Sequence, residues 1–168
     1  KSGEPFNHYV MGVDAIPNAV QRSCTGNLKI RAIRWYLEDV CGYERPWLQM
    51  IGIRADEQRR AAKIHGKLED GQDRFCPLWI DGVTAQEVGD FWFQNNFDLQ
   101  LPNNKGITDW GNCDLCFLKG KSKRLSIIRE RPDLADWWIE AEKKKGQFFR
   151  PDQPSYEQMK VIASDQGK

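Results

Sequence analysis

The stretch WLQMIGIRADEQRR, residues 47–60, decides the expected fold class. Its first seven residues form an apolar run of the length of a buried strand, and Asp56 and Glu57 favour the first turn of a helix. A strand, then an arginine, then a helix start is the arrangement found at the carboxyl edge of an open α/β sheet, where anionic ligands bind. We therefore expect an α/β domain with Arg54 at its ligand-binding edge.

Outside this stretch the pattern is mostly helical. Thr84 with Glu87 three residues later matches a capping box, and Pro132 separates two helical patterns. Helices are expected at residues 28–43, after Thr84, and at residues 122–131, 133–145 and 155–163, with a loop at residues 69–73 and an edge strand or extended segment at residues 75–80. These elements predict a Rossmann-like open parallel sheet in residues 1–110. A Cys-x-x-Cys segment and helical extension in residues 111–168 are expected to pack on it as one structural unit.

Composition narrows the class of protein. The 168 residues suit one domain with a core, and a formal net charge of +1 does not by itself indicate nucleic acid. No run of about 18 apolar residues predicts a membrane span, and no signal peptide is recognisable. Five cysteines, an odd number, favour a reducing, cytoplasmic compartment with metal-bound or free thiols. Because residues 1–18 show no clean period and begin without methionine, we expect an upstream portion with further strands.

A second stretch, GNCDLCFLKG at residues 111–120, places two residues between Cys113 and Cys116. A tight turn at this spacing directs both sulfurs to one metal centre. Zinc would need further ligands, for which His8 and His65 are candidates, whereas a cubane iron–sulfur cluster accepts one close pair with distant cysteines. The spacing favours zinc and a cluster equally, with an unmetallated pair as the third reading.

The other three cysteines have different surroundings. Cys24 lies beside Arg22 just before a predicted helix, an environment that favours the thiolate, the form that binds metal. Cys41 falls on the apolar stripe of that helix, so we expect a buried structural thiol. Cys76 is either a core residue or a ligand.

Two groups of basic residues are candidates for binding an anion. Arginine holds phosphate or sulfate through a planar, two-pronged fork, and Arg54 is the best placed because it ends a predicted strand. The groups consist of Arg22, Lys29, Arg31 and Arg34, and of Arg54, Arg59, Arg60 and Lys63; a solvated helix face is the alternative for both. The sequence contains no P-loop, no Gly-x-Ser-x-Gly elbow and no His-Glu-x-x-His helix.

Four blocks of residues occur in a fixed order. They are Arg22-x-Cys24-Thr25-x-x-Leu28-Lys29-Ile30, Ile51-Gly52-Ile53-Arg54-Ala55-Asp56-Glu57-x-x-Arg60, Cys76-Pro77-Leu78 with Val83-Thr84, and Gly111-Asn112-Cys113-x-x-Cys116. With these blocks the sequence resembles the phosphoadenosine phosphosulfate (PAPS) reductase family, above all its phage and bacterial reductase-like members. The resemblance extends from about Pro17 to Lys145.

The resemblance implies an adenine-nucleotide-binding fold of the ATP-pyrophosphatase type and a [4Fe–4S] cluster. Carried over from cluster-bearing relatives, Cys24, Cys113 and Cys116 become cluster ligands. Adenylylsulfate reductase relatives have a second cysteine where this chain has Thr25, so Cys76 or an exogenous group is expected as the fourth ligand.

The same resemblance implies that Lys29 and Arg54 contact the sulfate or phosphate groups at the catalytic centre, with Arg22 and Arg60 as further nucleotide contacts. Two features of the family are absent from the sequence. Its serine- and glycine-rich phosphate loop would lie upstream of Lys1, and the cysteine that takes up sulfite in thioredoxin-dependent members has no counterpart after Cys116.

Three functions follow as hypotheses. The first is a PAPS reductase-like iron–sulfur protein that binds an adenine nucleotide or sulfonucleotide and carries out sulfur chemistry as an oxidoreductase or sulfurtransferase. The second is a nucleic-acid sulfurtransferase, with the basic residues 119–124 and 143–145 touching phosphate, and the third is a non-catalytic, metal-stapled binding module. Expected partners are the nucleotide, an electron-donor protein, a nucleic acid or a second copy of the chain, and no membrane.

Overall fold

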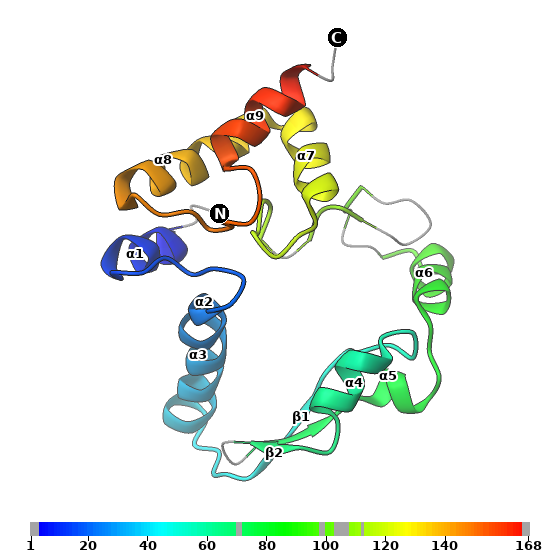
Figure 1. Ribbon diagram of the computed structural model, residues 1–168. Helices are drawn as coiled ribbons and strands as arrows, with labels where there is room; N and C mark the ends of the chain where they lie inside the picture. The colour runs from blue at the N-terminus through cyan, green and yellow to red at the C-terminus, as the bar shows by residue number, and fades with distance from the viewer. Residues whose placement is uncertain (1–3, 70–71, 98–99, 103–107, 112, 166–168) are drawn as a thin grey trace. The chain divides into compact units, whose positions relative to one another are not determined.

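The computed structural model describes residues 4–69, 72–97, 100–102, 108–111 and 113–165, and it contains both helices and strands. Its residues pack into two units. Unit 1 comprises Lys1–Tyr36 and Asp109–Lys168, and unit 2 comprises Leu37–Thr108. The strands of the described residues all lie in unit 2, and unit 1 is helical (Figure 1). The mixed character expected from the sequence is therefore confirmed, and residues 1–36 pack with the C-terminal segment.

Unit 2 is built on a small three-stranded sheet with the order β1-β3-β2. Strand β1 (Trp47–Met50) runs parallel to β3 (Gln72–Phe75), and β2 (Leu68–Glu69) pairs antiparallel with β3. Helix α4 (Gln58–Ile64) connects the parallel strands, as a crossover between parallel strands requires. The small core of unit 2 consists of Ile53, Ala61 and Cys76, with Ile51, Ile64 and Trp79 packed against it.

Two local expectations in unit 2 need correction. Of residues 69–73, expected as a loop, Glu69 belongs to β2 and Gln72 and Asp73 belong to β3, while residues 70–71 lie outside the described residues. Residues 75–80 are not extended after Phe75, because Pro77–Ile80 forms the short helix α5 with proline in its first turn. The fixed φ angle of proline suits that position, where its missing N–H is no loss.

The capping box expected after the sheet is confirmed. Helix α6 (Ala85–Gln94) begins after Thr84, whose hydroxyl accepts from the Glu87 N–H while the Glu87 carboxylate accepts from the Thr84 N–H at 2.7 Å. These two bonds satisfy amide groups that the helix leaves free at its start.

Unit 1 opens with two helical segments. Helix α1 (Glu4–Gly12) was not expected from the sequence, although Phe6, Tyr9 and Val10 lie at helical spacing. Helical residues then continue from Ser23 through α2 (Ser23–Thr25), the π-turn Gly26–Ile30 and α3 (Arg31–Trp35).

This second helical segment differs from the expected helix at residues 28–43. It starts at Ser23, and a further π-turn, Tyr36–Val40, carries it into unit 2. Cys41 follows it and is exposed, so the expectation of a buried thiol is wrong. The apolar stripe of this segment is largely uncovered, with Ile33 51% and Val40 54% exposed, which is why Cys41 has no core to enter.

The C-terminal helices of unit 1 agree with the sequence pattern. They are α7 (Lys121–Glu130), the 3₁₀ turn Pro132–Ala135, α8 (Asp136–Lys145) and α9 (Tyr156–Asp165). Helix α8 ends at Gly146, whose positive φ of 61° is the left-handed conformation that glycine adopts without strain. None of the helices in the described part of the chain is long and apolar enough to cross a bilayer.

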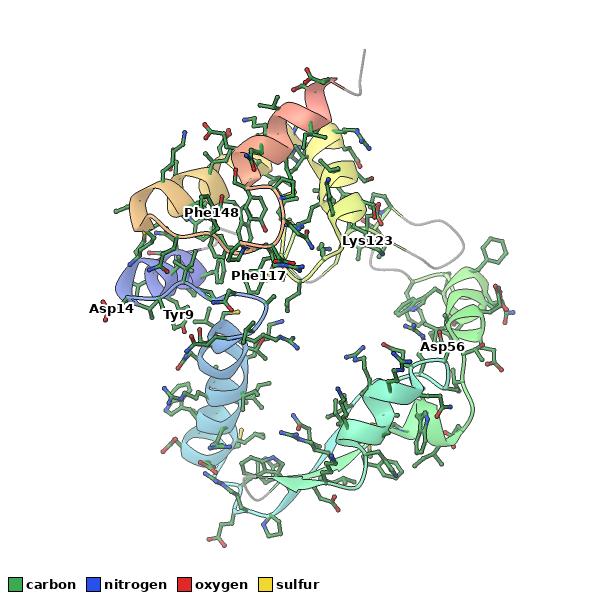
Figure 2. The ribbon with its side chains drawn as sticks, in the orientation of Figure 1. Tyr9, Asp14, Asp56, Phe117, Lys123 and Phe148 are labelled. Carbon is green, nitrogen blue, oxygen red and sulfur yellow. The ribbon has the colours of Figure 1, made fainter. Side chains whose placement is uncertain are left out.

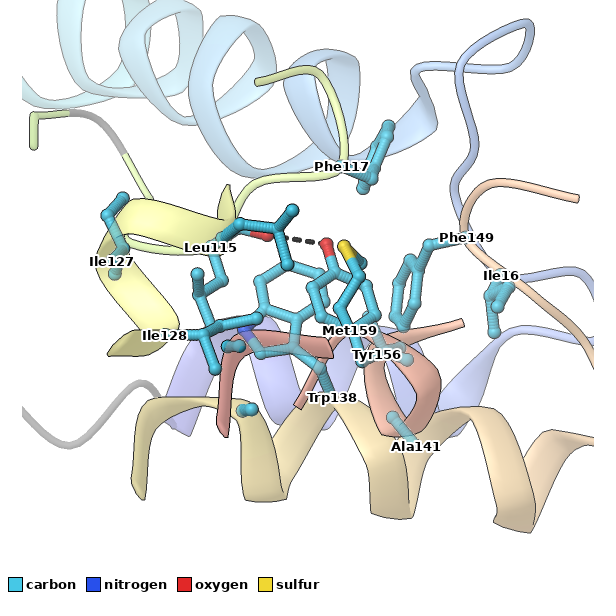
Figure 3. Packing of buried hydrophobic residues seen from close by; sticks show 14 residues of the cluster. Ile16, Leu115, Phe117, Ile127, Ile128, Trp138, Ala141, Phe149, Tyr156 and Met159 are labelled. Atoms are coloured by element: carbon cyan, nitrogen blue, oxygen red, sulfur yellow. Dashed lines mark hydrogen bonds between the residues drawn. The ribbon is translucent and has the colours of Figure 1, made fainter. Parts of the chain in front are cut away.

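Aromatic residues from distant parts of the sequence form the core of unit 1 (Figure 3). Trp138 of α8 stacks on Tyr156 of α9 with ring centroids 4.9 Å apart, and Phe149 meets Trp138 edge-on at 4.8 Å. Phe6 of α1 lies 5.6 Å from Trp138, which fixes the N-terminal helix to the C-terminal ones. Aromatic rings bury large apolar surfaces, so their packing contributes to the stability of unit 1.

Candidate metal and anion site

The Cys-x-x-Cys loop is anchored in the core of unit 1. Leu115, between the two cysteines, is completely buried, and Phe117 is 1% exposed and stacks on Phe149. The backbone of the loop is held as well. The Tyr156 hydroxyl donates to the Leu115 carbonyl at 2.5 Å (dashed line in Figure 3), and the Arg150 guanidinium donates to the Phe117 carbonyl at 3.1 Å. The side chains around this loop are drawn in Figure 2.

The two cysteines of the loop face different environments. The Cys116 N–H donates to the Cys113 carbonyl at 3.2 Å, which closes the tight turn that the spacing predicts. Cys113 is exposed and Cys116 is half-buried. Partial burial of its sulfur raises the pKa of Cys113, and the negative charge of Cys116 raises it further, while Lys29 and Lys119 act in the opposite direction.

Lys119 lies beside the pair and contacts the backbone before it. Its ammonium group donates to the Asp109 carbonyl at 2.5 Å and to the Gly111 carbonyl at 2.9 Å. Burial lowers the pKa of Lys119, and the negative charges of Cys116 and Asp114 oppose this effect. The Asp109 carboxylate also forms an ion pair with Lys123, with Oδ1 and Nζ 3.5 Å apart. Two lysines that follow the cysteine pair, Lys119 and Lys123, therefore contact the segment that enters the loop.

Three predicted site residues from the N-terminal part, Arg22, Cys24 and Lys29, belong to unit 1. Cys24 is half-buried and packs against the same core as Leu115 and Phe117. Lys29 is exposed, and its charge acts on the Cys113 thiol although the two residues are far apart in the sequence. The structure thus brings three of the four predicted cysteine ligands and two predicted anion contacts, Arg22 and Lys29, into one unit.

The described residues do not yet form a closed metal site. Among residues 4–69, 72–97, 100–102, 108–111 and 113–165, no group of three or more His, Cys, Asp or Glu side chains is close enough to hold a metal ion. Cys76 lies in unit 2, where it is fully buried beside Ile53 and Ala61.

The histidines considered for zinc lie apart from the cysteine pair in sequence and in their contacts. His65 also belongs to unit 2 and accepts the Cys76 N–H at 3.2 Å through Nδ1. His8 is an exposed residue of α1. The histidine contact in unit 2 is to the backbone of Cys76, and this gives His65 a structural role there.

The predicted anion contacts of unit 2 converge on two carboxylates. The Arg54 guanidinium donates to both oxygens of Asp56, at 3.0 and 3.3 Å, and lies 3.7 Å from a Glu57 oxygen. Arg60 also pairs with Glu57. The bond from Arg54 is the main cause that lowers the pKa of Asp56. The two-pronged face of Arg54 is therefore occupied by a carboxylate of its own loop, labelled at Asp56 in Figure 2.

The remaining basic residues are less engaged. Arg22 is exposed and immediately precedes α2, and Arg31 donates to Asn27 at 2.8 Å one turn earlier in the same helical segment. On α4, Arg59 and Lys63 are exposed, as the solvated-face alternative predicts.

Several of the basic residues proposed to touch nucleic acid make internal contacts. Lys143 forms an ion pair with Glu157 at 2.6 Å, and Lys145 donates to the carbonyls of Met11 and Val13 at 2.9 and 2.7 Å. Lys119 is bound to its own loop. Some of the basic residues in these runs therefore bind groups within the protein.

Sequence reasoning missed three residues that hold the site. Tyr156, Arg150 and Lys119 each donate to a carbonyl within or next to the Cys-x-x-Cys loop. The only sequence signal was the position of Lys119 directly after the cysteines, because the other two contacts join residues more than thirty positions apart. No family model, no curated protein and no solved structure matches this chain.

Proposed function

We propose that this chain is an iron–sulfur protein that binds an adenine nucleotide or sulfonucleotide and carries out sulfur chemistry, in the manner of PAPS reductase-like proteins. The observation that carries the proposal is the surroundings of the Cys113–Cys116 pair, which combine a tight turn, a rigidly anchored backbone and two flanking lysines, Lys29 and Lys119. The two lysines oppose the rise that burial causes in the pKa of Cys113, and so act toward the thiolate, the form in which cysteine binds metal.

Cys24, Cys113 and Cys116 would hold the cluster, with an exogenous group as the fourth ligand, because Cys76 is fully buried in the core of unit 2. Their donor set suits the group, because thiolates are the ligands of iron–sulfur clusters. When bound, the cluster would supply a charged centre that organises the sulfate end of the nucleotide. Lys29, exposed and within electrostatic reach of Cys113, would hold the anion at this centre.

Unit 2 would contribute the nucleotide-binding part. The parallel strands β1 and β3 joined by α4 are the unit from which a Rossmann-like sheet is built. Arg54 follows the carboxyl end of β1, where such folds bind ligands. An incoming sulfate or phosphate would compete with Asp56 for the guanidinium of Arg54.

Iron and acid-labile sulfide, measured in protein prepared without oxygen, test the metal part of the proposal. We expect the protein to contain iron and sulfide and to absorb at about 400 nm, as other clusters held by cysteine thiolates do. Cys24→Ser is expected to remove them, whereas Cys41→Ser serves as the matched control on an exposed cysteine of the same region. Colourless protein with stoichiometric zinc would refute the cluster, and unchanged iron in Cys24→Ser would remove Cys24 from the ligand set.

The nucleotide part has its own test. Binding of a labelled adenine sulfonucleotide is expected in the wild type and should be lost in Arg54→Ala. Arg59→Ala is the control, since Arg59 lies on the exposed face of α4. Equal binding by the two variants would refute the role of Arg54. Salt-sensitive binding to DNA or RNA without nucleotide would instead favour the nucleic-acid sulfurtransferase.

A further inference from the structure

The Cys-x-x-Cys loop is fixed by donors that come from two different sources. Tyr156 and Arg150 bind the carbonyls of Leu115 and Phe117 from the C-terminal part of the chain. Lys119, in contrast, is a residue of the loop itself. It follows Cys116 and reaches back to the chain that enters the loop before Cys113.

The contacts of Lys119 connect the end of the loop to the segment that enters it. Its single ammonium group donates to two carbonyls, those of Asp109 at 2.5 Å and Gly111 at 2.9 Å. The Lys119 N–H also donates to the Cys116 carbonyl at 2.9 Å, so the backbone of Lys119 is fixed on the cysteine while its side chain is fixed on the entry segment. The two ends of the loop are therefore held at a set separation.

We propose that Lys119 is a positioning residue for the Cys113–Cys116 pair. Its ammonium group binds the carbonyls of Asp109 and Gly111, in the segment that enters the loop, and thereby sets the separation of the two sulfurs. We call these two hydrogen bonds the clasp. The role of the pair as metal ligands rests on the proposed function, but the clasp itself is a property of the loop. An ammonium group has three donors and no acceptor, so one such group can donate to two carbonyls at once.

The expected consequence is a preorganised metal site. Groups that orient metal ligands from outside the coordination shell raise affinity about 10- to 100-fold. A loop without the clasp would have to order its backbone when the metal binds, and that ordering opposes binding. The clasp is therefore expected to strengthen binding of any metal that uses both sulfurs.

The test is a cobalt titration of the full chain, read from the thiolate-to-cobalt absorption band. Lys119→Met removes the donors and retains the length of the side chain, so we expect cobalt affinity to fall about tenfold or more. Lys119→Arg keeps donors and charge and is expected to restore most of the affinity. Lys121→Met, at an exposed lysine of the first turn of α7, is the matched control and should bind as the wild type does.

A second measurement needs no metal. The equilibrium between the Cys113–Cys116 disulfide and glutathione, resolved by peptide mass, reports the effective concentration of the two thiols. We expect Lys119→Met to lower it and Lys121→Met to leave it unchanged. Wild-type effective concentration in Lys119→Met overturns the proposal. If no protein gives the cobalt band, the metal site of the proposed function fails, and the disulfide equilibrium still decides the role of Lys119.

Discussion

Replacing Tyr156 by phenylalanine tests whether the core of unit 1 fixes the Cys-x-x-Cys loop. The change removes one oxygen, the hydroxyl that donates to the Leu115 carbonyl at 2.5 Å. The ring and its stacking on Trp138, with centroids 4.9 Å apart, remain. The measured effect is therefore that of the buried hydroxyl, which bonds the Leu115 carbonyl and also interacts with the buried Arg124.

The size of the effect follows from burial. Tyr156 is 1% exposed and Leu115 is 0% exposed, so water cannot replace the lost donor. A buried carbonyl left without a partner costs about 1–3 kcal/mol of unfolding free energy. Burial also raises the pKa of Tyr156, so the hydroxyl stays protonated and able to donate throughout the neutral range.

Urea unfolding followed by tryptophan fluorescence measures this loss, with amide hydrogen exchange at Cys116 as the local probe. We expect a lower unfolding midpoint and faster exchange of that amide in Tyr156→Phe. Tyr43→Phe is the control, because Tyr43 is 61% exposed and its change should fall within about 0.5 kcal/mol of the wild type. If Tyr156→Phe is as stable as Tyr43→Phe, the loop is not held by the core in the way described.

Three further changes probe the core, the anion site and a buried carboxylate. Leu115→Ala should cost about 2–5 kcal/mol in urea unfolding, whereas Leu118→Ala, at a side chain that is 39% exposed, should cost much less; equal losses would contradict the anchoring of the loop. Asp56→Asn weakens the carboxylate contact to Arg54, so we expect tighter sulfonucleotide binding in equilibrium dialysis, and weaker binding would show that Asp56 aids the site. Burial raises the pKa of Glu142 above its ordinary 4.5, so the stability that this side chain contributes is greatest below that pH and declines as the pH rises through the folded pKa. The unfolding free energy of the wild type should accordingly fall relative to that of Glu142→Gln as the pH rises above 4.5. A difference between the two proteins that does not change with pH would refute the shift.

Local signals in the sequence predicted the elements well where the physical cause is itself local. The Thr84–Glu87 capping box and the turn at Cys113–Cys116 each depend on residues within one turn of the chain, and both are present. Helix α7 begins and ends within a residue of expectation because Pro132 and the apolar period define it. The strand expected at residues 47–53 is shorter, with its regular part ending at Met50, and it is not buried as expected, because Leu48 and Met50 are exposed.

Predictions of burial and of strand structure failed where they depend on tertiary neighbours that cannot be identified from the sequence. The apolar stripe leading to Cys41 predicted a buried thiol, yet no element of the described chain covers it and the thiol is exposed. The strand β3 escaped notice because Gln72 and Asp73 are polar, and their extended form comes from pairing with β1 and β2. Strand pairing of this kind overrides intrinsic preference.

The sequence alone determined the chemical inventory of the site, namely a pair of cysteines at metal-ligand spacing, an arginine after a strand and lysines nearby. Only the tertiary structure decided how these groups are held. It placed Lys29 within electrostatic reach of Cys113, gave the fork of Arg54 to Asp56, and fixed the loop through Tyr156. The physical reason is that hydrogen bonds and charge interactions act over a few ångströms in space. Residues far apart in the chain come within that range only when the apolar core has formed.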